Sequence, residues 1–62
     1  VEYSEWIKAV HTAYKRQGGT YDEDTAADLI EVAAQFWQEN KEQLIELAFD
    51  AAVRVAIEAL DV

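Results

Sequence analysis

Carboxylates are the most numerous groups in this sequence that could bind a cation or act as general acids and bases, since Asp and Glu make up 13 of its 62 residues. The densest group is Asp22, Glu23 and Asp24, with Asp28 one helical turn further along. A calcium loop of the EF-hand type also needs alternating oxygen ligands, a central glycine and a closing glutamate, and this segment lacks that pattern. The four acids instead fit a helix start, where negative side chains face the partial positive charge of the helix N-terminus. We therefore predict no metal site here.

A second group of carboxylates recurs at helical spacing in the last third of the chain. It comprises Glu42, Glu46, Asp50 and Glu58. Di-iron helical bundles combine such glutamates with Glu-x-x-His motifs, and this sequence contains none. We interpret the row as the solvated side of a helix. Arg54, four residues from both Asp50 and Glu58, would add weak ion pairs along it.

The single histidine, His11, is the remaining candidate for acid-base chemistry. Lys8 and Lys15 are its helical neighbours, and nearby cations disfavour the protonated imidazole. A general base also needs an orienting partner and a pocket. Because the sequence has no cysteine and its serine and threonines occupy capping positions, no nucleophile is evident. We expect a protein without catalytic activity, cofactor or small-molecule substrate.

Three amphipathic segments must position these residues. The apolar spacing predicts one domain over residues 1–62, with helices over about 3–17, 24–38 and 41–61. Short connections between helices of this length predict an all-α fold, a three-helix up-down-up bundle. The last helix, apolar over much of its surface, is expected to be the central one.

The helix ends carry recognisable signals. Ser4 is predicted to cap the first helix, and Gly18 with Gly19 to end it. Two capping boxes, Thr20 with Glu23 and Thr25 with Asp28, compete for the start of the second helix. Six consecutive polar residues, 38–43, favour a break near Asn40. The alternative is one long bent helix over residues 25–61, because no glycine or proline interrupts it.

The predicted last helix is apolar on two sides. One continuous arc is expected to face the core: Leu44, Ile45, Ala48, Phe49, Ala51, Ala52, Val55, Ala56 and Ala59. A second apolar ridge, formed by Val53, Ile57 and Leu60 and extended by Leu47, lies among the charged residues. We predict that this ridge contacts a second copy or another protein, so that the bundle self-associates. The competing interpretation is that the chain's own first helix covers the ridge.

Charge and length narrow the possible partners. The formal net charge is −8, and residues 20–62 hold eleven acids against Lys41 and Arg54. Such a surface repels nucleic-acid phosphates and anionic lipids. No uninterrupted apolar run is long enough to span a bilayer, and no signal sequence is evident, so a soluble cytoplasmic protein is expected. A domain this small is marginally stable, and with no disulfide or metal available, oligomerisation is the expected remedy.

Three functional hypotheses remain open at this point. The first is a small acidic protein-interaction module that acts as a homo-oligomer or binds a partner protein. The second is a designed helical scaffold, suggested by the absence of Pro, Cys and Met and by well-placed caps. The third is an acidic regulator or inhibitor of a basic partner, which the net charge permits.

Overall fold

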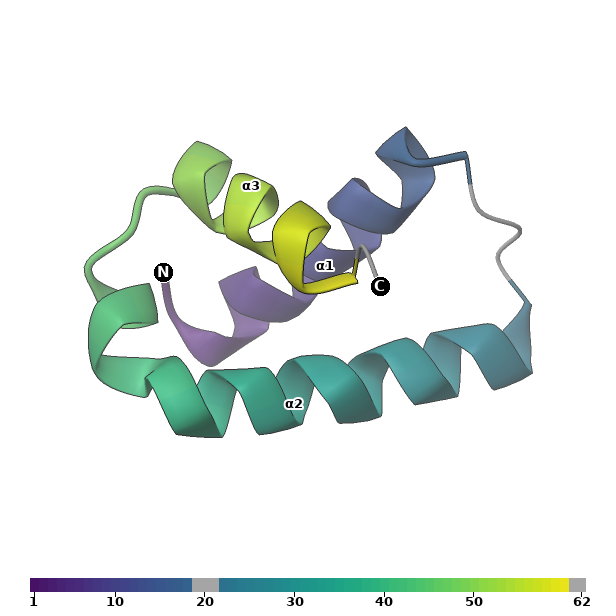
Figure 1. Ribbon diagram of the computed structural model, residues 1–62, viewed down its shortest axis with the longest axis horizontal. Helices are drawn as coiled ribbons and strands as arrows, with labels where there is room; N and C mark the ends of the chain where they lie inside the picture. Colours follow the sequence, from purple (N-terminus) through teal and green to yellow (C-terminus); the bar gives the residue numbers. More distant parts are fainter. Residues whose placement is uncertain (19–21, 61–62) are drawn as a thin grey trace.

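The computed structural model describes residues 1–18 and 22–60, the last of these without its side chain. Within this part of the chain there are three helices, α1 (Tyr3–Arg16), α2 (Glu23–Ile45) and α3 (Phe49–Leu60), and no strand. The all-helical prediction is confirmed. The chain reverses direction from each helix to the next, and α1 and α3 lie together on one side of α2 (Figure 1). This packing is compatible with the predicted bundle.

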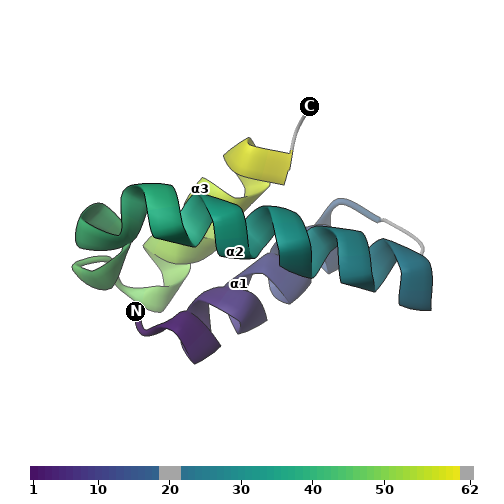
Figure 2. The same ribbon diagram turned by 90° about the horizontal axis from the view of Figure 1, so that it is seen from below.

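The central helix is α1, not the last helix as predicted. It packs against both of the others, most extensively against α3, whereas α2 and α3 contact each other least. Figure 2 shows α2 in front, with α1 and α3 behind it. Four fully buried residues form an alanine seam between α1 and α3. They are Ala9 and Ala13 of α1 and Ala52 and Ala56 of α3. Such small side chains allow two helix backbones to approach closely.

Aromatic side chains join α1 to α2. Trp6 is fully buried, and its indole Nε1 donates a hydrogen bond to the carbonyl of Ala33 at 2.9 Å. The same indole stacks on Phe36, with 5.6 Å between the ring centroids. Near the start of α1, Tyr3 meets Trp37 edge to face at 5.8 Å. Aromatic contacts of this kind stabilise a packing beyond the apolar area that they bury.

The predicted break near Asn40 is present as a kink inside α2. Asn40 has non-helical angles (φ −124°, ψ 20°), and its side-chain amide donates to the carbonyl of Phe36 at 3.1 Å. This side-chain bond satisfies part of the interrupted backbone ladder, so α2 bends at Asn40 and continues to Ile45. The chain turns at residues 46–48 instead. The predicted break is therefore confirmed, but the predicted helix 41–61 is not continuous, because residues 41–45 belong to α2 and the last helix begins at Phe49.

The helix ends confirm some of the predicted signals and correct others. Glu2, not Ser4, is the N-cap of α1, and its amide donates to the carboxylate of Glu5 at 3.4 Å. Gly18 has a φ of 76° just after the C-cap, the left-handed conformation that glycine adopts readily, as predicted. The Gly19 and Thr20 signals lie outside the described residues.

The cap of α2 is Asp22, which neither capping box predicted. Its carboxylate accepts the backbone amide of Thr25 at 2.7 Å. That bond, with a smaller contribution from the side-chain hydroxyl of the same threonine, holds the pKa of Asp22 below its ordinary value of 3.8. Thr25 itself lies inside the helix. Glu23 and Asp24 add negative charge to the first turn, as predicted.

The start of the chain closes the far end of α2. The ammonium group of Val1 donates to the carbonyls of Leu44, Ile45 and Leu47 at 3.3, 2.9 and 2.7 Å. The carbonyl of Leu44 also accepts the backbone amide of Leu47 at 3.1 Å. Carbonyls in the last turn of a helix commonly lack a partner within the helix, so the bond to Ile45 satisfies a group that would otherwise require water. The contact brings the beginning of α1 beside the turn from α2 to α3, as Figure 1 also shows.

Candidate functional site

The predicted interface ridge lies largely against the chain's own core. Val53 is 1% exposed, and Ile57 and Leu47 are partly buried and pack against the core residues. Gln17, at the end of α1, donates from Nε2 to the carbonyl of Ile57 at 3.4 Å. The side chain of Leu60 lies outside the described residues. The contact with another molecule at these positions stays a prediction, and Val53 has almost no surface to offer it.

Two large residues of the predicted core arc that flank the turn lie at the surface, although Leu44 is buried as predicted. Ile45 and Phe49 are 50% and 41% exposed. The helical wheel failed here because residues 46–48 are not helical, so Ile45 belongs to α2 and Phe49 begins α3. Asp50, an acid in the first turn of α3, is the local signal that favours a helix start at this point.

A shallow apolar depression lies between α1 and the start of α3. Its volume is about 560 Å³, and its lining residues are Ile7, Lys8, His11, Thr12 and Phe49. We call it the α1–α3 depression. Ile7 is half-buried, so apolar surface from two helices borders the hollow. Sequence reasoning missed this site because it treated Phe49 as a core residue.

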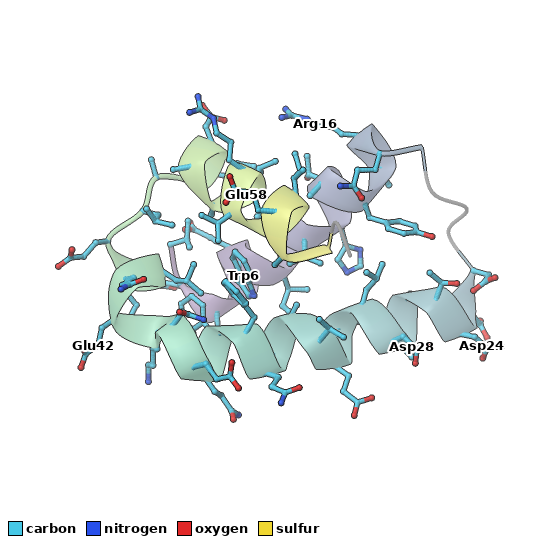
Figure 3. The ribbon with its side chains drawn as sticks, viewed as in Figure 1. Trp6, Arg16, Asp24, Asp28, Glu42 and Glu58 are labelled. Carbon is cyan, nitrogen blue, oxygen red and sulfur yellow. The ribbon has the colours of Figure 1, made fainter. Side chains whose placement is uncertain are left out.

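Cations lie along the helix that forms this depression. Lys8, Lys15 and Arg16, all exposed, account for three of the five lysines and arginines of the chain. Figure 3 shows Arg16 at the outer end of α1, and Asp24, Asp28 and Glu42 on the side of α2 that faces away from the other helices. The surface is therefore electrostatically divided between a basic α1 and an acidic α2.

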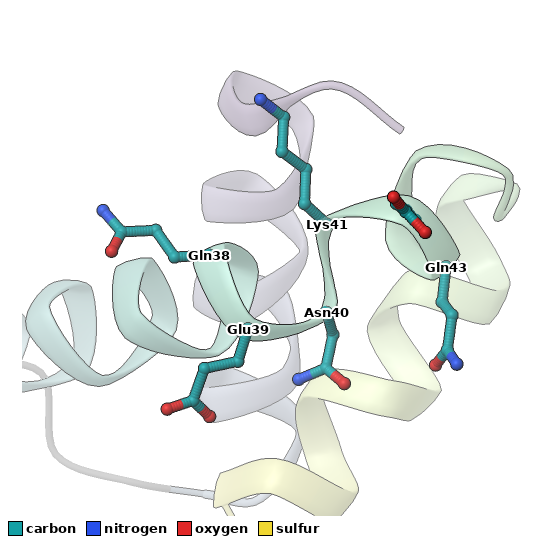
Figure 4. A pocket seen from close by; sticks show the side chains of 6 residues that line it. Gln38, Glu39, Asn40, Lys41 and Gln43 are labelled. Carbon is teal, nitrogen blue, oxygen red and sulfur yellow. The ribbon is translucent and has the colours of Figure 1, made fainter.

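The kink at Asn40 carries a polar hollow of about 380 Å³, lined by residues 38–43. Figure 4 shows the side chains of Gln38, Glu39 and Lys41 spreading away from one another. The amide of Asn40 is bonded to the carbonyl of Phe36. Groups that diverge in this way do not form a binding site, because a ligand needs donors and acceptors that converge on it.

A third hollow, of about 320 Å³, lies between α2 and α3. Val32, Gln35, Phe36, Glu39 and Ala59 line it. Val32 is 49% exposed. This hollow lies between the two helices that contact each other least, so it follows from their loose packing.

The described residues contain no group of three or more His, Cys, Asp or Glu side chains placed to hold a metal ion. No helix in the same part of the chain has both the length and the apolar character needed to cross a membrane. In comparisons with known proteins, no family model, curated protein or solved structure shows significant similarity to this chain. Function must therefore be inferred from the surface of this molecule alone.

Proposed function

We propose that this protein is a non-catalytic interaction module that self-associates through the α1–α3 depression. The observation that supports the proposal is the position of Phe49, a large aromatic side chain left 41% exposed beside an apolar hollow. Aromatic residues are enriched at the centres of protein interfaces, where they fill partner pockets and exclude water. Half-buried Ile7 extends the same apolar surface.

The size of the molecule favours an additional contact. Among the residues that the structure describes, five of the ten buried core residues are alanines, which bury little apolar surface each. A stable interface covers about 800 Å² of each partner, roughly a fifth of the surface of this chain. Burial of the apolar part of such an interface, after the cost of lost translational and rotational freedom, would add to a marginal free energy of unfolding.

The proposal can be tested by sedimentation equilibrium over a wide concentration range. We expect the average mass of the wild type to rise with concentration. Phe49→Ser should remove the apolar anchor and shift the association to at least about tenfold higher concentration. Val32→Ser is the matched control, since Val32 is similarly exposed but lines the hollow between α2 and α3. That variant should associate like the wild type.

Circular dichroism must show that each variant keeps the helical content of the wild type. A wild type that remains monomeric at every concentration would contradict the proposal. The acidic-regulator and designed-scaffold hypotheses would then be favoured, since both are compatible with a stable monomer. Salt-sensitive binding to a basic protein would identify the regulator.

A further inference from the structure

We infer that the occupant of the α1–α3 depression is a second copy of this chain, which inserts one face of its α2. This inference rests on the proposed self-association and names the two surfaces that meet. The inserted face, called here the α2 face, consists of Glu23, Ala27, Ile30 and Glu31. All four residues are exposed.

The α2 face combines an apolar side chain with carboxylates. Glu23, Ala27, Ile30 and Glu31 follow the spacing i, i+4, i+7 and i+8, which places them on one side of a helix. Ile30 is 40% exposed, although it is a large aliphatic side chain. The face is an acidic amphipathic helix surface of the kind that binds a groove through apolar anchors.

The α1–α3 depression has the complementary chemistry. Its apolar border, Phe49 and Ile7, would receive Ile30 of the second copy. Lys8 lines the hollow, and Lys15 follows it two turns further along the same side of α1. These two lysines are about 10 Å apart along the helix, and Glu23 and Glu31 about 12 Å apart, at 1.5 Å per residue. Both carboxylates could therefore approach a lysine at the same time.

A symmetric contact of one depression with another would be less favourable. It would bring Lys8 and Lys15 of one copy toward the same lysines of the other, and like charges juxtaposed at an interface are strongly unfavourable. The net charge of −8 opposes the approach of two copies at long range. Physiological salt screens exposed charges beyond about 8 Å, so local complementarity determines the bound arrangement.

The inferred contact joins two different surfaces. Each copy in a dimer would keep one unused depression and one unused α2 face, unless the geometry closes into a ring. We therefore expect the average mass of the wild type to rise beyond that of a dimer at high concentration. Raising the salt concentration above the physiological level should weaken the association, because the long-range repulsion is already screened there and the ion pairs are exposed to solvent.

A mixing experiment tests this arrangement directly. Phe49→Ser disables the depression and leaves the α2 face intact, whereas the double variant Ile30→Ser/Glu31→Lys does the reverse. Each variant alone should be monomeric. Their equimolar mixture has one intact surface of each kind, so native mass spectrometry should detect a heterodimer that neither variant forms alone. The mixture should not grow beyond this heterodimer.

Two results would overturn the inference. The Ile30→Ser/Glu31→Lys variant could still associate like the wild type, which would leave the proposed self-association standing but refute the role of the α2 face. The mixture could also remain monomeric while both components are folded and the wild type associates. If Phe49→Ser is unfolded by circular dichroism, the exposed substitution Lys8→Glu replaces it. A monomeric wild type would contradict the proposed function itself.

Discussion

Replacing Trp6 with phenylalanine tests the contact that attaches α2 to the central helix. Trp6 is fully buried, stacks on Phe36 and donates its indole N–H to the carbonyl of Ala33. Phenylalanine keeps an aromatic ring at this position but loses the donor and the second ring. The carbonyl of Ala33 lies within α2 and still accepts the helical bond from the amide four residues later, so it is not left without a partner.

The expected loss follows from two contributions. The missing ring removes roughly 40 Å² of buried apolar surface, worth about 1 kcal/mol. The hydrogen bond contributes a further ~1 kcal/mol net. A chain of this length has a free energy of unfolding of about 3–9 kcal/mol. Losing about 2 kcal/mol should therefore leave Trp6→Phe folded, with the midpoint of thermal unfolding lowered by about 10 °C.

Urea unfolding monitored by tryptophan fluorescence provides the measurement, with Trp37→Phe as the matched control. Each variant keeps one tryptophan as a reporter. Trp37 is 7% exposed and meets Tyr3 edge to face, so its replacement should cost about 1 kcal/mol from lost burial. The difference between the two variants measures the bond to Ala33. A Trp6→Phe variant at least as stable as Trp37→Phe would refute the reasoning.

Two further predictions concern the helix ends. Gly18→Ala should lower the free energy of unfolding by about 1 kcal/mol in a thermal melt, because alanine is strained at a φ of 76° although nothing lies within 4 Å of the added carbon. Gly18→Asn should lose less stability in the same measurement. Equal stability of the wild type and both variants would contradict the strain argument. The lowered pKa of Asp22 predicts a stabilisation that is present above the ordinary pKa of 3.8 and is lost as the pH falls through the lower pKa of the folded state. Urea titrations across this range should show the wild type approaching the stability of Asp22→Asn as the carboxylate becomes protonated. A difference that does not change with pH would exclude the charge of the carboxylate as its source, because asparagine can also cap the helix.

The number and type of the helices could be predicted because they depend on local patterns. Apolar residues recur at helical spacing throughout, and Gly18 supplies the conformation that ends α1. The polar run 38–43 indicated the bend at Asn40, but the turn was harder to place. Asn40 bends α2 without ending it because its side chain bonds to the carbonyl of Phe36. The turn at residues 46–48 contains neither glycine nor proline, so no strong local signal marks it.

The inward and outward faces of α3 could not be predicted from that helix alone. Val53 lies among charged residues on the helical wheel, yet it is buried, while Phe49 lies at the exposed start of the helix. Which side of an apolar helix is covered depends on where the helix begins and on which neighbour packs there. The α1–α3 depression arises from that packing, so Ile7 and Phe49 show no relation to each other in the sequence.

The alanine seam limits how the sequence of this fold can vary. Ala9 and Ala13 on the first helix and Ala52 and Ala56 on the last are fully buried, and inserting larger side chains into such a seam forces the backbones apart. Any chain that keeps this helix pairing must therefore keep two small residues four positions apart on both helices. Size at these four positions, more than the charge of the surrounding surface, is the property by which a distant relative of this protein would be recognised.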